Sequence, residues 1–108
     1  MYGLDQNIIK EIQRVFSQNN FVEEAILYGS RAKGNYRNGS DIDLVVAGKN
    51  LSTDSIYLLE EQLEALGFLY KFDVQHIATI NNTALLKHIR EEGKLFYKKD
   101  NEDQPDEG

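Results

Sequence analysis

The stretch that decides the fold is LYGSRAKGNYRNGSDIDL, residues 27–44, which joins two apolar segments through a polar connection. The first segment, residues 25–28, is apolar and stops at Gly29, as a short buried strand does. The second, residues 41–47, begins by alternating acidic and apolar side chains, which predicts a strand with one buried face. Residues 29–39 are rich in Gly, Ser, Asn and Arg and predict a loop or a short helix.

Apolar residues at helical spacing predict three helices around this stretch. The first covers residues 5–18, the second carries an apolar stripe from Ile56 to Leu66, and the third runs through Leu85 to Ile89. Each begins after a side chain that can cap a helix, and the two later helices end at glycine. The first helix begins after Asp5, the second begins after Ser52 and ends at Gly67, and the third begins after Asn81 or Asn82 and ends at Gly93.

Two further strands are predicted at residues 68–77 and 94–98. Helices and strands that alternate in this way pack as a sheet with helices on it. The connection between the first two strands is short and has no room for a full crossover helix, so a purely parallel sheet is not expected. The predicted fold class is therefore α/β (α+β), with a mixed β-sheet and helices packed on it.

Size and composition fit one compact domain, since the chain has 108 residues, of which 41% are hydrophobic. The absence of cysteine excludes disulfides, thiolate metal sites and a cysteine nucleophile. The net charge is −6, and five of the 18 acids lie in the last nine residues. We therefore predict a domain over residues 1–99 and an acidic, disordered tail over residues 100–108.

The same composition excludes several classes of partner. An acidic chain is poorly suited to binding long nucleic acid through its phosphates. No apolar run approaches the roughly 20 residues of a membrane span, and the first residues do not match a signal peptide. We expect a soluble, cytoplasmic protein without a membrane partner. A local basic cluster of Arg31, Lys33 and Arg37 could still bind a small phosphorylated ligand.

Three aspartates are the candidates for chemistry. Asp41 and Asp43 are two residues apart in a predicted strand, so they project to one face, about 6.5 Å apart along the chain. Asp73 lies between two apolar residues of another strand and joins them if the two strands are neighbours. Clustered acids repel one another, so one or two Mg²⁺ ions would stabilise them. The alternative is that Asp41 caps a turn and that Asp43 and Asp73 are ordinary surface acids.

Gly29 and Ser30 are candidates for phosphate binding. Glycine after a strand lets the backbone approach a phosphate closely, and Ser30 adds a hydroxyl and a backbone N–H. The pattern is not a P-loop, because Asn35 and Tyr36 stand where that motif needs Lys and Ser or Thr. The charged candidates for the same phosphates, which can equally be solvated charges, are Arg31, Lys33 and Arg37.

Gly29-Ser30, ten residues and then Asp41-x-Asp43 resemble the signature of the DNA polymerase β-like nucleotidyltransferase superfamily. The fuller string, GSRAKGNYRNGSDIDL, is similar to its minimal prokaryotic branch, the MNT proteins, and the resemblance covers about residues 20–97. It implies a polymerase β palm-like fold. It also implies that Gly29 and Ser30 bind the triphosphate, that Asp41 and Asp43 bind magnesium, and that Asp73 completes the metal site and aids the nucleophile.

The resemblance also implies a function. Members of this branch are typically paired with a HEPN-type toxin, and some neutralise it by attaching AMP to a tyrosine. We therefore expect Mg²⁺-dependent transfer of AMP from ATP to a hydroxyl of such a partner, with the chain acting as an antitoxin in a homo- or hetero-oligomer. Two alternatives stay open: a non-catalytic module that neutralises its partner by forming a complex, and transfer to a small molecule such as an aminoglycoside.

Other polar and aromatic residues are assigned to structure at this stage. His76 and His88 are each isolated in the sequence and do not suggest a metal pair or a catalytic dyad. Tyr28, like the other tyrosines of the predicted strands, is expected to be a core or half-buried residue.

Overall fold

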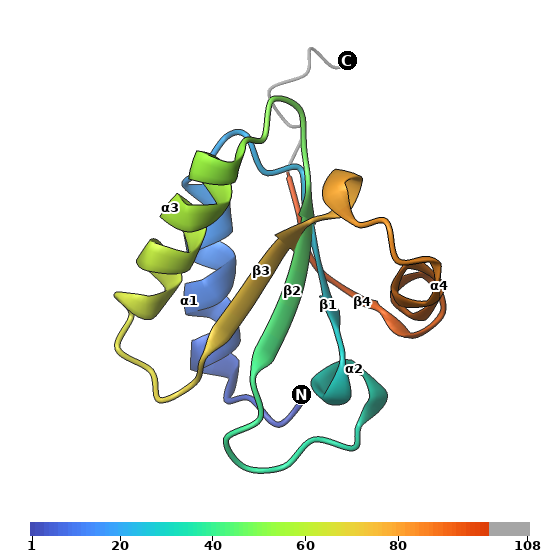
Figure 1. Ribbon diagram of the computed structural model, residues 1–108. Helices are drawn as coiled ribbons and strands as arrows, with labels where there is room; N and C mark the ends of the chain where they lie inside the picture. Colours follow the sequence, from blue (N-terminus) through green and yellow to red (C-terminus); the bar gives the residue numbers. More distant parts are fainter. Residues whose placement is uncertain (100–108) are drawn as a thin grey trace, which may run out of the picture.

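The computed structural model describes residues 1–99, so the predicted acidic tail lies outside the described residues. Helices and strands alternate along the chain as the sequence predicts (Figure 1). The elements are α1 (Gln6–Ser17), β1 (Glu24–Tyr28), α2 (Ser30–Lys33), β2 (Ile42–Ala47), α3 (Thr53–Glu64), β3 (Phe72–His76), the short 3₁₀ helix η1 (Ile77–Thr79), α4 (Thr83–Glu92) and β4 (Lys94–Lys98).

The four strands form one mixed sheet in the order β3-β2-β1-β4, which confirms the predicted fold class. Strand β1 is antiparallel to both of its neighbours, β2 and β4, whereas β2 and β3 are parallel. Helices α1 and α3 lie on one side of the sheet, and α2 and α4 lie on the other (Figure 1). The parallel step from β2 to β3 passes through α3, because parallel strands need a long crossover connection.

The predicted helix caps are present. The Asp5 carboxylate accepts a hydrogen bond from the backbone N–H of Asn7 at 2.9 Å. Ser52 caps α3 and Asn82 caps α4 through their side chains. Strand β3 begins at Phe72 and is shorter than predicted, because residues 68–71 form the connection from α3, in which the Lys71 carbonyl accepts a hydrogen bond from the Ile42 N–H at 2.9 Å. The helix η1 was not predicted.

The main core lies between the sheet and helices α1 and α3. Strand β2 contributes Ile42, Leu44 and Val46, which are fully buried on this side as their alternation predicts. Val45 is also buried, but it belongs to a second, smaller cluster with Tyr28 of β1 and Ile89 of α4. Strand β2 is therefore buried on both faces along its middle, which fixes its position in the sheet.

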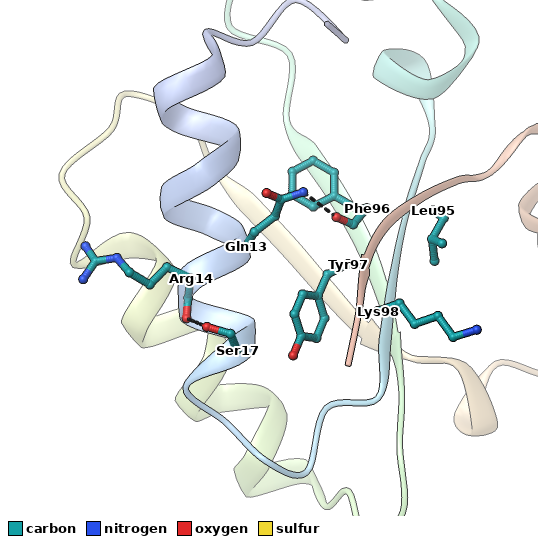
Figure 2. Close-up of a pocket in the computed structure, with 7 residues that line it drawn as sticks. All are labelled: Gln13, Arg14, Ser17, Leu95, Phe96, Tyr97 and Lys98. Atoms are coloured by element: carbon teal, nitrogen blue, oxygen red, sulfur yellow. Dashed lines mark hydrogen bonds between the residues drawn. The ribbon is translucent and has the colours of Figure 1, made fainter. Parts of the chain in front are cut away.

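Both edges of the sheet carry side-chain hydrogen bonds. On β4 the register with β1 shifts at a bulge, and the side-chain amide of Gln13 donates to the Phe96 carbonyl at 2.9 Å (Figure 2). On β3 the Val74 N–H donates to the Glu60 carboxylate at 3.2 Å. Such contacts occupy backbone groups that an edge strand would otherwise present for pairing with another chain.

Figure 2 shows the groove between α1 and β4, which has a volume of about 440 Å³. Its lining includes Gln13, Ser17 and Tyr97 and contains none of the predicted site residues. The groove therefore lies outside the predicted site. Within residues 1–99, no helix combines the length and the apolar character that crossing a membrane requires.

The burial of side chains in the core can be tested by replacing a buried leucine and an exposed leucine by alanine. Leu63 of α3 is fully buried, and Leu69 is 99% exposed. We expect Leu63→Ala to lower the free energy of unfolding by about 2–5 kcal/mol, because it removes apolar contacts and leaves a cavity. Leu69→Ala should change it by less than about 0.5 kcal/mol. Urea denaturation of the two variants measures both values, and similar losses would contradict the described core.

Candidate active site

Strand β1 ends at the end of the sheet where β2 and β3 begin (Figure 1), and the predicted acids lie in or directly before the first residues of β2 and β3. Asp43 is the second residue of β2 and Asp73 the second residue of β3, and the two are register partners in the parallel pair. Tyr28, the last residue of β1, is the partner of Asp43 on the other side. Residues that are opposite each other in a sheet point to the same face. The predicted placement of Asp73 beside Asp43 is therefore confirmed.

Asp41 lies immediately before β2 and is exposed, whereas Asp43 is half-buried. Among residues 1–99, no group of three or more His, Cys, Asp or Glu side chains is gathered closely enough to hold a metal ion. The three acids thus share one end of the sheet without forming a compact set of ligands. Their assignment as magnesium ligands stays a prediction.

The electrostatics of Asp43 show how the acids act on one another. Burial raises the pKa of the Asp43 carboxyl above its ordinary value, and the negative charges of Asp73 and Asp41 raise it further. The positive charge of Arg31 acts in the opposite direction but does not cancel this effect. Asp43 and Asp73 lie side by side and offer carboxylate oxygens, the ligand type that Mg²⁺ takes, but among residues 1–99 they do not form a closed set of three ligands with Asp41.

Tyr28 is buried in a hydrophobic cluster, as predicted, but it also lies beside the acids, which the sequence reasoning did not anticipate. It is 6% exposed, and its hydroxyl accepts a hydrogen bond from the Gln75 side-chain amide at 3.1 Å. Burial and the charges of Asp73 and Asp43 raise the pKa of Tyr28 to about 12. The phenol is therefore neutral at ordinary pH and presents a hydroxyl beside the acids. In the sequence, the position of Tyr28 directly before Gly29 was the signal that could have placed it near the site.

Gly29 brings the backbone against the Asp43 carboxylate. Its dihedral angles are φ 76° and ψ −154°, a region that is essentially restricted to glycine. A Cβ atom added to Gly29 would overlap the Asp43 Oδ2 atom. The turn predicted to bind phosphate and the carboxylate predicted to bind magnesium therefore belong to one site. Ser30 follows as the first residue of α2 and is half-buried.

His88 also lies at this site, although the sequence reasoning assigned it only to structure. The backbone N–H of Gly29 donates a hydrogen bond to the His88 Nε2 atom at 2.9 Å. The His88 ring meets the Tyr28 ring edge-on, with centroids 6.1 Å apart. His88 comes from α4, far from Gly29 in the sequence, so no local motif indicates this contact.

Arg31, which was predicted to bind nucleotide, is buried and hydrogen-bonded to the backbone. It is 3% exposed, and all three guanidinium nitrogens donate to backbone carbonyls. Nε and Nη2 donate to the Ser40 carbonyl at 3.1 and 2.9 Å, and Nη1 donates to the Tyr2 carbonyl at 3.0 Å. The guanidinium also lies near the rings of Tyr70 and Tyr36, 4.9 and 5.4 Å from their centroids.

These contacts tie the connection between α2 and β2 to the N-terminal segment, immediately before Asp41. Arg31 therefore positions this connection through three of its donors. Its assignment to nucleotide binding stays a prediction. Lys33 and Arg37, the other basic candidates, are exposed, so their side chains are free of this constraint. Their assignment to phosphate binding stays a prediction.

Comparisons with known proteins identify the family. The family model described as polymerase beta, nucleotidyltransferase, matches residues 10–102. The chain belongs to this family. The comparison with curated protein sequences gives no match.

Solved structures show the same fold. A toxin–antitoxin crystal structure with AMP-PNP matches at a TM-score of 0.66 and 24% identity, over 93% of this chain and 77% of that chain. A structure of the tri-AMPylated Shewanella oneidensis HEPN toxin in complex with MNT antitoxin matches at a TM-score of 0.66 and 20% identity, over 88% of this chain and 73% of that chain. The MntA–HepT toxin–antitoxin structure matches at a TM-score of 0.66 and 21% identity, over 87% of this chain and 73% of that chain. At these identities the likeness establishes the polymerase β-like nucleotidyltransferase fold.

The close approach at Gly29 predicts the effect of a single methyl group. Gly29→Ala adds a Cβ in a glycine-only conformation and displaces the Asp43 carboxylate, so we expect a loss of stability of about 2 kcal/mol or more. Gly34→Ala is the control, because Gly34 also has a positive φ of 91° but its Cβ would meet nothing within 4 Å. Urea denaturation should show a loss of only about 1 kcal/mol for Gly34→Ala. Equal losses would refute the contact with Asp43.

The raised pKa of Asp43 predicts how stability depends on pH. A carboxyl whose pKa is higher in the folded than in the unfolded state costs stability when it ionises, and the cost disappears as pH falls through the folded pKa. At pH 7 we therefore expect Asp43→Asn to be at least as stable as the wild type. The difference between the two should shrink as the solution is acidified, which urea denaturation over a pH series measures.

The control for this series is Asp54→Asn, in the exposed first turn of α3. This acid lies near a helix N-terminus, so its neutralisation should lower stability by about 0.3–1 kcal/mol. The two substitutions make the same chemical change and are expected to have opposite signs. A destabilised Asp43→Asn variant would contradict the electrostatics described for the site.

Proposed function

We propose that the chain is an antitoxin that transfers AMP from ATP to a hydroxyl of a HEPN-type protein partner, with Mg²⁺ as cofactor. The observation that carries the proposal is the pairing of Asp43 with Asp73 on neighbouring strands, with the Asp43 carboxylate against the Gly29 turn. This arrangement gathers acids for a cation and an open backbone turn for phosphates at one end of the sheet. Phosphoryl transfer depends largely on such positioning and on electrostatic stabilisation.

Each residue has a role in the proposal. Asp41, Asp43 and Asp73 would bind one or two Mg²⁺ ions, which when bound neutralise phosphate charge and orient the triphosphate. Gly29 has no Cβ, which lets the Asp43 carboxylate lie against the turn, and Ser30 offers its hydroxyl and backbone N–H to a phosphate. Lys33, exposed at the end of α2, supplies a positive charge to the outer phosphates.

The proposed reaction is a displacement at the α-phosphorus. The acceptor oxygen forms a bond to this phosphorus, and the bond to the bridging oxygen of the β-phosphate breaks. Pyrophosphate leaves with the electron pair of that bond, and the hydroxyl proton passes to the Asp73 carboxylate. Asp73 suits this role because it is exposed, whereas Asp43 is half-buried beside the turn.

The protein acceptor is supported by the shape of the site and by the relatives. Asp73 lies on β3, which is an edge strand of the sheet, and its side chain is exposed. It is therefore open to a hydroxyl of another molecule. Of the chains that share the fold, one comes from a toxin–antitoxin structure with AMP-PNP and another from a complex with an AMPylated HEPN toxin.

A second candidate function is neutralisation of the partner by complex formation alone. It is favoured by one observation, that the acids of residues 1–99 do not form a compact metal-binding group. The two candidates differ in what happens to the partner, since only the enzyme changes its mass.

The decisive experiment uses the chain co-expressed with the product of the neighbouring gene, followed by mass spectrometry of that product. We expect a mass gain of one or more AMP groups. With purified proteins, labelled ATP and Mg²⁺, Asp43→Asn and Asp73→Asn should each reduce transfer by at least about 100-fold, because charge stabilisation is lost. Asp54→Asn, which removes an acid elsewhere, should retain the wild-type rate.

Two results would change the assignment. Full activity of Asp43→Asn would refute the enzymatic proposal. A partner that is neutralised in a stable complex, without a change in its mass, would establish the second candidate instead.

A further inference from the structure

We infer that His88 is a positioning residue of the nucleotide site, which fixes the Gly29–Ser30 turn for the triphosphate through its hydrogen bond to Gly29. The inference rests on the proposed function, because it assumes that this turn binds the triphosphate. It adds α4 to the elements that build the site, in addition to the ends of β1, β2 and β3.

The contact itself defines the state of the imidazole. The Gly29 N–H is a donor, and the His88 Nε2 atom accepts it at 2.9 Å. An imidazole nitrogen that accepts a hydrogen bond carries no proton, so in this state the ring is neutral and its proton is on Nδ1. Gly29 follows the last residue of β1, beyond the ladder with β2, so its N–H needs a partner from outside the sheet.

The turn needs the hydrogen bond to His88 because the backbone of a glycine can adopt many conformations. Gly29 has no side chain to restrict its backbone, and other backbone conformations of Gly29 would move Ser30 relative to Asp43. The hydrogen bond from α4 favours the one conformation in which the Gly29 backbone lies against the Asp43 carboxylate. The phosphate turn and the carboxylate are thereby set in position before the nucleotide binds.

The position of His88 is itself determined by packing. The next residue, Ile89, is buried and belongs to the small cluster with Tyr28 and Val45. The His88 ring is half-buried and meets the Tyr28 ring edge-on. Anchored in this way, α4 presents Nε2 to Gly29 with little freedom to move away.

The test separates the hydrogen bond from simple packing. His88→Phe keeps an aromatic ring against Tyr28 but has no acceptor, whereas His88→Gln keeps an acceptor at about the position of Nε2. We expect His88→Phe to weaken binding of AMP-PNP with Mg²⁺ by about tenfold, the effect of one lost hydrogen bond. KM for ATP should rise similarly, kcat should change less, and His88→Gln should recover most of the affinity.

The control is His76→Phe, which replaces the other histidine, at the end of β3, and should leave affinity and KM unchanged. Calorimetry measures the affinities and thermal melting confirms that the variants fold. Wild-type affinity in His88→Phe would overturn the inference while leaving the proposed function intact. A wild-type protein that binds no AMP-PNP would instead refute the proposed function, and the inference with it.

An independent measurement covers the case in which His88→Phe does not fold. In the ¹⁵N NMR spectrum of the wild type, the Gly29 amide should exchange slowly with solvent, and the His88 Nε2 resonance should be that of an unprotonated nitrogen. The Gly29 resonance should also shift when AMP-PNP and Mg²⁺ are added. Rapid exchange of the Gly29 amide, as in an open loop, would overturn the inference.

Discussion

The site depends on the contact between the Asp43 carboxylate and the backbone of Gly29. Strand β2 is buried on both faces along its middle, so Asp43, near its start, cannot move away from the end of β1. Only glycine leaves room for the carboxylate at this point. Burial and the neighbouring acids oppose the charge of Asp43, and the fold therefore maintains a local excess of negative charge. Such an arrangement opposes ionisation of Asp43 and reduces stability where this carboxyl is ionised.

The residues around this contact divide into those that offer groups to a ligand and those that hold the chain in place. Arg31 belongs to the second kind, since its donors are used by the carbonyls of Ser40 and Tyr2. His88 accepts a hydrogen bond from the Gly29 backbone N–H. Both are charged or polar residues near the Gly29–Ser30 turn, and both form hydrogen bonds to backbone groups. Lys33 differs because its side chain is exposed.

Local patterns in the sequence predicted most of the fold. Alternation in β2 gave its buried face, and the capping residues Asp5 and Ser52 marked the helix starts, because these signals act between neighbours in the chain. The start of β3 was predicted too early, since residues 68–71 are apolar enough for a strand but connect α3 to the sheet. Asp41, Asp43 and Asp73 were recognisable as acids at strand positions, but only the pairing of β2 with β3 brings two of them together.

By itself, the sequence determined the elements, the mixed character of the sheet and the identity of the acids and the glycine–serine turn. These features depend on residue type and on short spacings along the chain. The tertiary structure alone decided that Arg31 is buried, that Tyr28 lies beside the acids and that His88 reaches Gly29. These contacts join residues from separate elements, and their geometry depends on how the helices pack on the sheet.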